Sequence, residues 1–197
     1  VPIAGDSVTL GFTLPDGTSD GITLKAVTGT PDAGEFQIGA DAAATATNFS
    51  AALQTSLQVH AKTQLVAASN NAASSNFFNG QGQTSQRVQP NPDFAHATTL
   101  VAADPSTTVV WYTGGDSSNP RSSIQARVDD AQTVNYGAQA NESGTLSMIR
   151  SLAVLAIQTF DSSDPTTEGR FDAIATRNVS SFSTTHSSDP GSIEMLG

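Results

Sequence analysis

The run Gly5-Asp6-Ser7 contains a serine that could serve as a nucleophile. Such a serine needs a buried strand to deliver it, a histidine to take its proton and an acid to orient that histidine. Only residues 1–4 precede this run, and Ser183 rather than an acid stands three residues before His186. We therefore interpret the run as a turn that opens a strand and predict no catalytic residue. A serine hydrolase is kept as a less favoured alternative.

Metal chemistry has few candidate ligands in this chain. His60, His96 and His186 stand far apart, which is not the spacing of a metal-binding pair on one helix. The chain has no cysteine, so thiolate ligands, disulfides and cysteine nucleophiles are excluded. Its carboxylates do not follow the Asp-x-Asp-x-Asp-Gly pattern of a calcium-binding EF-hand. We predict no metal site and no cofactor.

Trp111 and Tyr112 are the residues whose types best suit contact with a ligand. Exposed Trp and Tyr rings have an apolar face and a polar edge, so the pair could form a platform for carbohydrate. Both residues fall in an expected strand at 107–113, where alternation turns one of them inward and favours core packing. A secreted adhesin, or a carbohydrate-binding or phage-tail-like module, is therefore the alternative function.

Composition and charge exclude several classes of partner. The chain of 197 residues has 8 basic and 18 acidic residues, a net charge of −10 at pH 7, and only 13% charged residues. Nucleic acids and anionic membrane surfaces attract basic proteins, so we expect neither as a partner. A polar, weakly charged surface fits a secreted protein. Arg127 stands beside Asp129 and Asp130, and we interpret it as part of a local ion pair.

The first seventy residues predict a β-β-β-α unit. Alternating apolar residues indicate a hairpin over 7–28, with a Pro-Asp-Gly turn at 15–17. A short strand is expected around 36–38. The apolar spacing then becomes helical, and Asp41 is a suitable N-cap for an amphipathic helix over 42–60.

The rest of the chain alternates between strands and helices. Asn141 is expected to cap a widely apolar helix that runs to about residue 160, which we interpret as a central buried helix backing the sheet. Asp164 is expected to cap the last helix, with Pro165 in its first position. Further strands are predicted at 63–68, 99–103, 107–113, 122–128 and 133–136, and one or two helical turns at 72–78.

These elements indicate the α+β class, with an antiparallel or mixed β-sheet packed against a few amphipathic helices. We expect a single globular domain over 1–182. Two sub-lobes, 1–68 and 98–182, could be joined by the loop-rich segment 69–97. Residues 183–197 are expected to be a linker followed by the start of a helix that is cut short.

Three segments carry a resemblance to a known family. The first is the opening at 5–18 with 22–24 and 76–79, the second is Val110 to Gly114 followed by 121–128, and the third is 136–142 followed by the apolar helix. Together they resemble the variable and C-terminal portion of bacterial flagellins and flagellin-like hook-associated proteins. The resemblance covers most of the chain, and it rests on segment order and not on a catalytic signature.

The resemblance implies a structural role without catalysis. In that family, long helices at the two chain ends pair into a stem that assembles the filament or the hook–filament junction, while globular domains between them face outward. It implies an extracellular location on the flagellum, other flagellar subunits as partners, and homo-oligomers formed through stem helices absent from this chain. Without those helices we expect a monomer. Filament subunit and junction protein are both left open.

Overall fold

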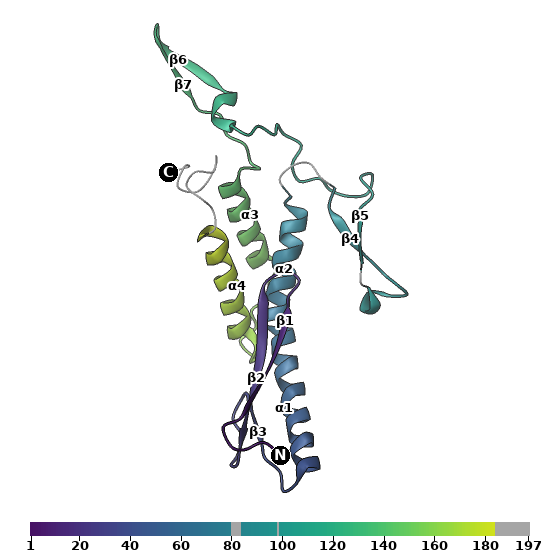
Figure 1. Cartoon of the computed structure of the whole chain (residues 1–197). Coiled ribbons are helices and arrows are strands. Elements are labelled where there is room, and N and C mark those ends of the chain that lie inside the picture. The colour runs from purple at the N-terminus through teal and green to yellow at the C-terminus, as the bar shows by residue number, and fades with distance from the viewer. Residues whose placement is uncertain (80–83, 98, 184–197) are drawn as a thin grey trace. The chain divides into compact units, whose positions relative to one another are not determined.

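The computed structural model describes residues 1–79, 84–97 and 99–183 and has an α+β fold that opens with a β-β-β-α unit. Figure 1 labels its helices and strands along the chain, which divides into two compact units. Unit 1 comprises residues 1–70 and 159–174, and the described part of unit 2 comprises 71–79, 84–97, 99–158 and 175–183. This division differs from the expected sub-lobes 1–68 and 98–182, because both units are discontinuous in sequence.

A three-stranded sheet forms the first layer of unit 1. Its order is β1 (Ser7–Thr13), β2 (Ser19–Val27) and β3 (Glu35–Gln37), with β1 antiparallel and β3 parallel to β2. Gly17 takes the positive φ of +81° that the predicted turn between β1 and β2 requires. In the register, Leu10 lies opposite Ile22, so the apolar residues of the hairpin share one face.

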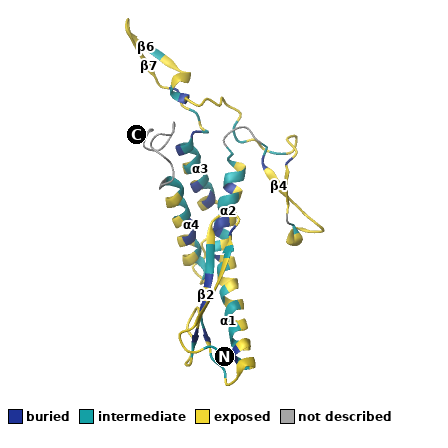
Figure 2. Cartoon of the chain, in the orientation of Figure 1, coloured by how far each residue is buried: buried dark blue, intermediate teal, exposed yellow. Residues whose placement is uncertain are grey.

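Helix α1 (Ala42–Lys62) covers the apolar face of this sheet. The carboxylate of Asp41 accepts a hydrogen bond from the backbone N–H of Ala44 at 2.8 Å, as expected for an N-cap. Figure 2 shows the buried positions along β2 in dark blue. The core consists of Ile22, Leu24, Ala26 and Phe36, with Phe49 and Leu53 of α1 packed against it.

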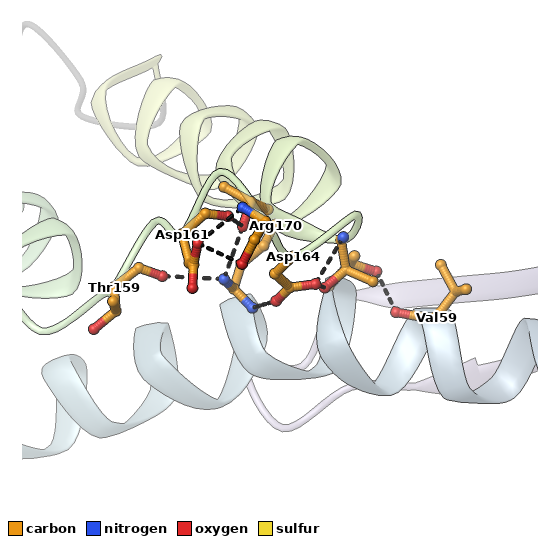
Figure 3. A network of polar contacts seen from close by, with 9 residues as sticks. Val59, Thr159, Asp161, Asp164 and Arg170 are labelled. Atoms are coloured by element: carbon orange, nitrogen blue, oxygen red, sulfur yellow. Dashed lines mark hydrogen bonds and ion pairs between the residues drawn. The ribbon is translucent and has the colours of Figure 1, made fainter.

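Helix α2 (Gln64–Phe77) occupies the segment where the sequence predicts a strand at 63–68, and that prediction is wrong. Alanine-rich sequence favours helix, and the backbone N–H of Ala67 donates to the carbonyl of Thr63 at 3.0 Å. Thr63 separates α2 from α1. Its hydroxyl donates to the carbonyl of Val59, a side-chain bond to the preceding turn that tends to bend helices (Figure 3).

A polar turn at 159–166 precedes helix α4 (Thr167–Ser183). The guanidinium of Arg170 donates to the carbonyl of Thr159 at 3.0 Å and to the carboxylate of Asp164 at 3.4 Å (Figure 3). Asp164 accepts from the N–H and hydroxyl of Thr166 and does not cap a helix that starts at Pro165. The helix therefore begins two residues later than predicted, because a hydrogen-bonded turn forms first.

Unit 2 contains two separate two-stranded antiparallel sheets and helix α3 (Ser143–Ala156). Glu142 and not Asn141 is the residue before the first turn of α3, and the helix ends near residue 156 and not 160. Its other elements are β4 (Gln86–Gln89), η1 (Phe94–His96), β5 (Thr99–Ala102), η2 (Pro120–Ser123), β6 (Gln125–Asp129) and β7 (Gln132–Asn135).

Two further predictions for unit 2 are wrong. Residues 107–113 form no strand. Their alternating apolar residues suit a strand, but no described strand lies beside them to pair with. The first residues of the strand expected at 122–128 belong to the 3-10 helix η2. The prediction of a linker and helix start at 183–197 falls, apart from Ser183 at the end of α4, outside the described residues.

Candidate assembly surface

Among the described residues, Ser7, His60 and His96 do not come together as a catalytic or metal-binding group. Ser7 is exposed at the start of β1, and its hydroxyl is bonded to neither His60 nor His96. Those histidines instead contact Asp20 and Asp93, at 3.1 and 2.7 Å. His186 lies outside the described part of the chain. No group of three potential metal ligands, and no helix long and apolar enough to cross a bilayer, occurs within it.

Trp111 and Tyr112 belong to a small aromatic cluster in unit 2. Their ring centroids lie 5.4 Å apart and tilted by 36°, and Trp111 meets Phe78 edge to face at 5.4 Å. The indole N–H donates to the carbonyl of Asn79, and the Tyr112 hydroxyl donates to the carbonyl of Gly115. Both rings are half-buried, and their polar groups are used within the protein, which favours a packing role for the pair.

One face of α3 is an uncovered apolar feature of unit 2. Met148, Leu152 and Leu155 follow one another at four- and three-residue spacing, so they form a stripe along the helix. All three are exposed, Leu152 by 59% and Met148 by 49%. The prediction that α3 is a central buried helix is therefore wrong. Only Gly144, Ser151 and Val154 of this helix are buried.

An ion pair holds the N-terminal end of α3. Glu142 is buried, and its carboxylate accepts two hydrogen bonds from the guanidinium of Arg121, at 2.6 and 3.2 Å. It also accepts from the backbone N–H of Gln139. Arg121 donates further to the carbonyl of Gly137. These bonds tie the segment around η2 to the residues that lead into α3, and satisfy a carboxylate that would otherwise be costly to bury.

Gly137 explains how these segments approach so closely. It is buried, and a Cβ atom at this position would overlap the carbonyl oxygen of Pro120 and the hydroxyl of Ser123. Its own N–H donates to the carbonyl of Arg121 at 3.1 Å. The position therefore requires glycine for space.

The middle of α3 is held by the C-terminal end of α2. Ser74 donates its hydroxyl to the carbonyl of Arg150 at 3.0 Å, and Arg150 donates twice to the carbonyl of Phe78, at 2.6 and 3.1 Å. A cation at a helix C-terminus is favourable. Burial lowers the pKa of Arg150 from its usual value. The two hydrogen bonds to the carbonyl of Phe78 hold its guanidinium at the end of α2. The apolar stripe of α3 is thus presented by an anchored helix.

The hairpin of β6 and β7 lies between η2 and α3 in sequence. Its expected ion pair is confirmed, because Arg127 and Asp130 lie 3.0 Å apart. The guanidinium also donates to the carbonyl of Asp129. Both side chains are exposed, so the pair shapes the turn and adds little stability.

Sequence reasoning found the apolar residues of α3 but not their exposure. A wide apolar arc has the same spacing whether a neighbour covers all of it or part of it. The Arg121–Glu142 pair was also missed, since 20 residues separate its members and no local pattern links them. No family model matches the chain, and neither a curated protein nor a solved structure matches it.

Proposed function

We propose that this chain is the outward-facing part of a structural subunit of the bacterial flagellum, either a flagellin or a hook-associated protein. It would act outside the cell, without catalysis, and assemble with other flagellar subunits through stem helices. The proposal starts from the three segments that resemble that family. It does not depend on any enzymatic group.

The observation that carries the proposal is the exposed apolar stripe Met148, Leu152 and Leu155 on α3. Apolar patches on a protein surface mark sites of association, and spacing of four and three residues suits a partner helix. The helix that bears the stripe begins directly after the resembling segment 136–142. The resemblance implies stem helices that pair with each other, and we infer in addition that one of them packs on this face of α3.

Contacts between two of the resembling segments support the same proposal. Arg121 opens the second half of one segment, and Glu142 closes the next. Their ion pair joins the segments at the base of α3. Residues that resemble the family therefore cooperate in positioning the helix that would meet the stem.

Immunogold electron microscopy of source cells tests the proposal. An antibody raised against this chain should label the filament along its length if the protein is a flagellin. Label only where hook meets filament would identify a junction protein. Unlabelled flagella, with gold elsewhere on the cell surface, would reject the flagellar role and favour the secreted adhesin or carbohydrate-binding alternative.

A further inference from the structure

The outer edge of β1 presents unpaired backbone groups. The backbone N–H of Ala26 donates to the carbonyl of Asp6, and the backbone N–H of Leu14 donates to the carbonyl of Thr18. The backbone N–H and C=O groups of the even-numbered residues of β1 therefore point toward β2. Antiparallel ladders alternate, so the N–H and C=O groups of the odd-numbered residues point away from β2. Within the described residues, no strand pairs with that side of β1. The residues whose backbone groups point away from β2 are Ser7, Thr9, Gly11 and Thr13.

This edge lacks the devices that usually protect an edge strand. Residues 7–13 contain no charged residue and no proline, and β1 pairs with β2 without a register shift. The opposite edge of the sheet differs. Strand β3 has only three residues, and Glu35 within it pairs with Lys25 at 3.2 Å. A further strand can therefore add beside β1, and β3 is a poor site for one.

An uncovered apolar row lies beside the same edge. Val8 and Leu10 point to the face that α1 covers, yet they are 46% and 38% exposed. A groove of about 400 Å³ lies between the sheet and the start of α1. Its lining includes Val1, Val8, Phe36, Ala46 and Phe49. A strand added at β1 would use the backbone groups of this edge and continue the apolar row of Val8 and Leu10.

We propose that β1 is a docking site for β1 of a second copy of this chain, with the two strands antiparallel and Leu10 opposite Leu10. The outward-pointing groups must pair with each other, which restricts the possible registers. This register alone uses all four odd-numbered residues of both copies. Val8 then lies opposite Phe12, so each apolar side chain meets another on the side that faces α1.

The uncharged sequence of β1 allows a second copy to be the occupant, and its self-complementary register favours one. Each chain carries a net charge of −10, so two copies repel where carboxylates face each other. Residues 7–13 carry no charge, and the pairing brings no carboxylate of either strand against another. The two edges are also the same strand, which suits the self-complementary interface of a twofold dimer. The result is a six-stranded sheet that ends in the short, charged β3 strands.

The dimer is expected to be weak. One strand pair buries less than the roughly 1,000 Å² typical of stable interfaces, so association should depend on concentration. This replaces the sequence-based expectation of a monomer with a monomer–dimer equilibrium. The inference rests on β1 alone and is independent of the proposed flagellar role.

Disulfide trapping tests the register. Because the chain has no cysteine, Leu10→Cys introduces a single thiol. In the proposed register the two Leu10 residues face each other without exchanging backbone hydrogen bonds. The Cα atoms of such a pair lie about 4.5 Å apart, which is within reach of a disulfide. The two Val8 residues would lie about 13 Å apart along the strands, out of reach. Under a glutathione redox buffer, Leu10→Cys should form covalent dimers at least about tenfold faster than Val8→Cys.

Gln54→Cys, on the exposed side of α1, measures random collision between chains. If Leu10→Cys dimerises no faster than this control, the pairing is wrong. Equal trapping of Val8→Cys would overturn the register.

Sedimentation velocity of the cysteine-free chain gives a second measurement. The dimer fraction should rise with concentration and fall at least about fivefold in Thr9→Pro, which removes one outward N–H and no backbone hydrogen bond to β2. The substitution also removes the hydrogen bond between the hydroxyls of Thr9 and Thr23. Circular dichroism confirms that this variant is folded before it is compared. A monomer at all concentrations, or an unchanged dimer in Thr9→Pro, would overturn the proposal.

Discussion

Glu142 shows how one residue can hold a helix in place. The side chain of Glu142 is buried, while that of Arg121 is partly exposed. Removing the negative charge of Glu142 leaves the guanidinium of Arg121 without its charged partner. We predict that Glu142→Gln lowers the free energy of unfolding by about 2–4 kcal/mol. Urea unfolding followed by circular dichroism measures the change.

The exposed pair formed by Arg127 and Asp130 provides the matched control. Asp130→Asn should change the free energy of unfolding by less than about 1 kcal/mol, since water screens both charges. Equal losses in the two variants would mean that the Arg121–Glu142 pair does not anchor α3.

Asp164 makes the stability of unit 1 depend on pH. Hydrogen bonds from the backbone N–H and hydroxyl of Thr166, with a smaller effect of Arg170, lower the pKa of this carboxyl from its usual value of 3.8. The folded state thus binds the proton less readily than the unfolded chain. The resulting stabilisation is complete above the unfolded pKa and is lost as pH falls through the folded pKa.

We therefore predict that thermal stability declines as pH falls below about 4, and that Asp164→Asn makes this decline shallower. Melting temperatures between pH 7 and pH 2 provide the measurement. Asp172→Asn, at an exposed position of α4, also removes one carboxylate and is the matched control. A wild-type profile in Asp164→Asn would contradict the prediction.

At the scale of elements, the start of α1 depends on its cap. Asp41 accepts the N–H of Ala44, which would otherwise have no partner within the first turn. Asp41→Ala should lower the free energy of unfolding by about 1 kcal/mol. Ser50→Ala, on the exposed face of the same helix, should change it by less than about 0.5 kcal/mol. Urea unfolding of both variants would distinguish a cap from a general effect of alanine.

At the scale of the whole molecule, unit 2 exposes large apolar side chains on more than one element. Leu152 on α3 and Val128 on β6 are each 59% exposed. Leu152→Gln should therefore leave the melting temperature nearly unchanged, because little packing is lost. If the proposed function is right, the same change in the full-length subunit should strongly reduce its incorporation into flagella.

Val128→Gln is the matched control for this prediction, and it should be incorporated like the wild type. Quantitative blotting of purified flagella compares the two variants. Equal incorporation would show that the stripe on α3 is not an assembly surface.

The sequence by itself determined the elements whose signals are local. The hairpin of β1 and β2, the cap of α1 and the α+β class follow from alternation, turn residues and capping, which act over a few neighbouring residues. The segment 63–68 was misassigned because a short apolar run fits a strand and a helix equally well. The aromatic pair at 111–112 was found from residue type, but a half-buried cluster could not be distinguished from a platform on a strand.

Tertiary structure alone decided what each apolar face meets. The stripe of α3 and the open edge of β1 have ordinary patterns, and only the arrangement of neighbouring elements shows that nothing within the described residues covers them. Likewise, Arg121 and Glu142 meet because the hairpin of β6 and β7 returns the chain to η2, where Gly137 allows a close approach. Burial and pairing across the fold depend on non-local contacts, and no pattern within one segment contains them.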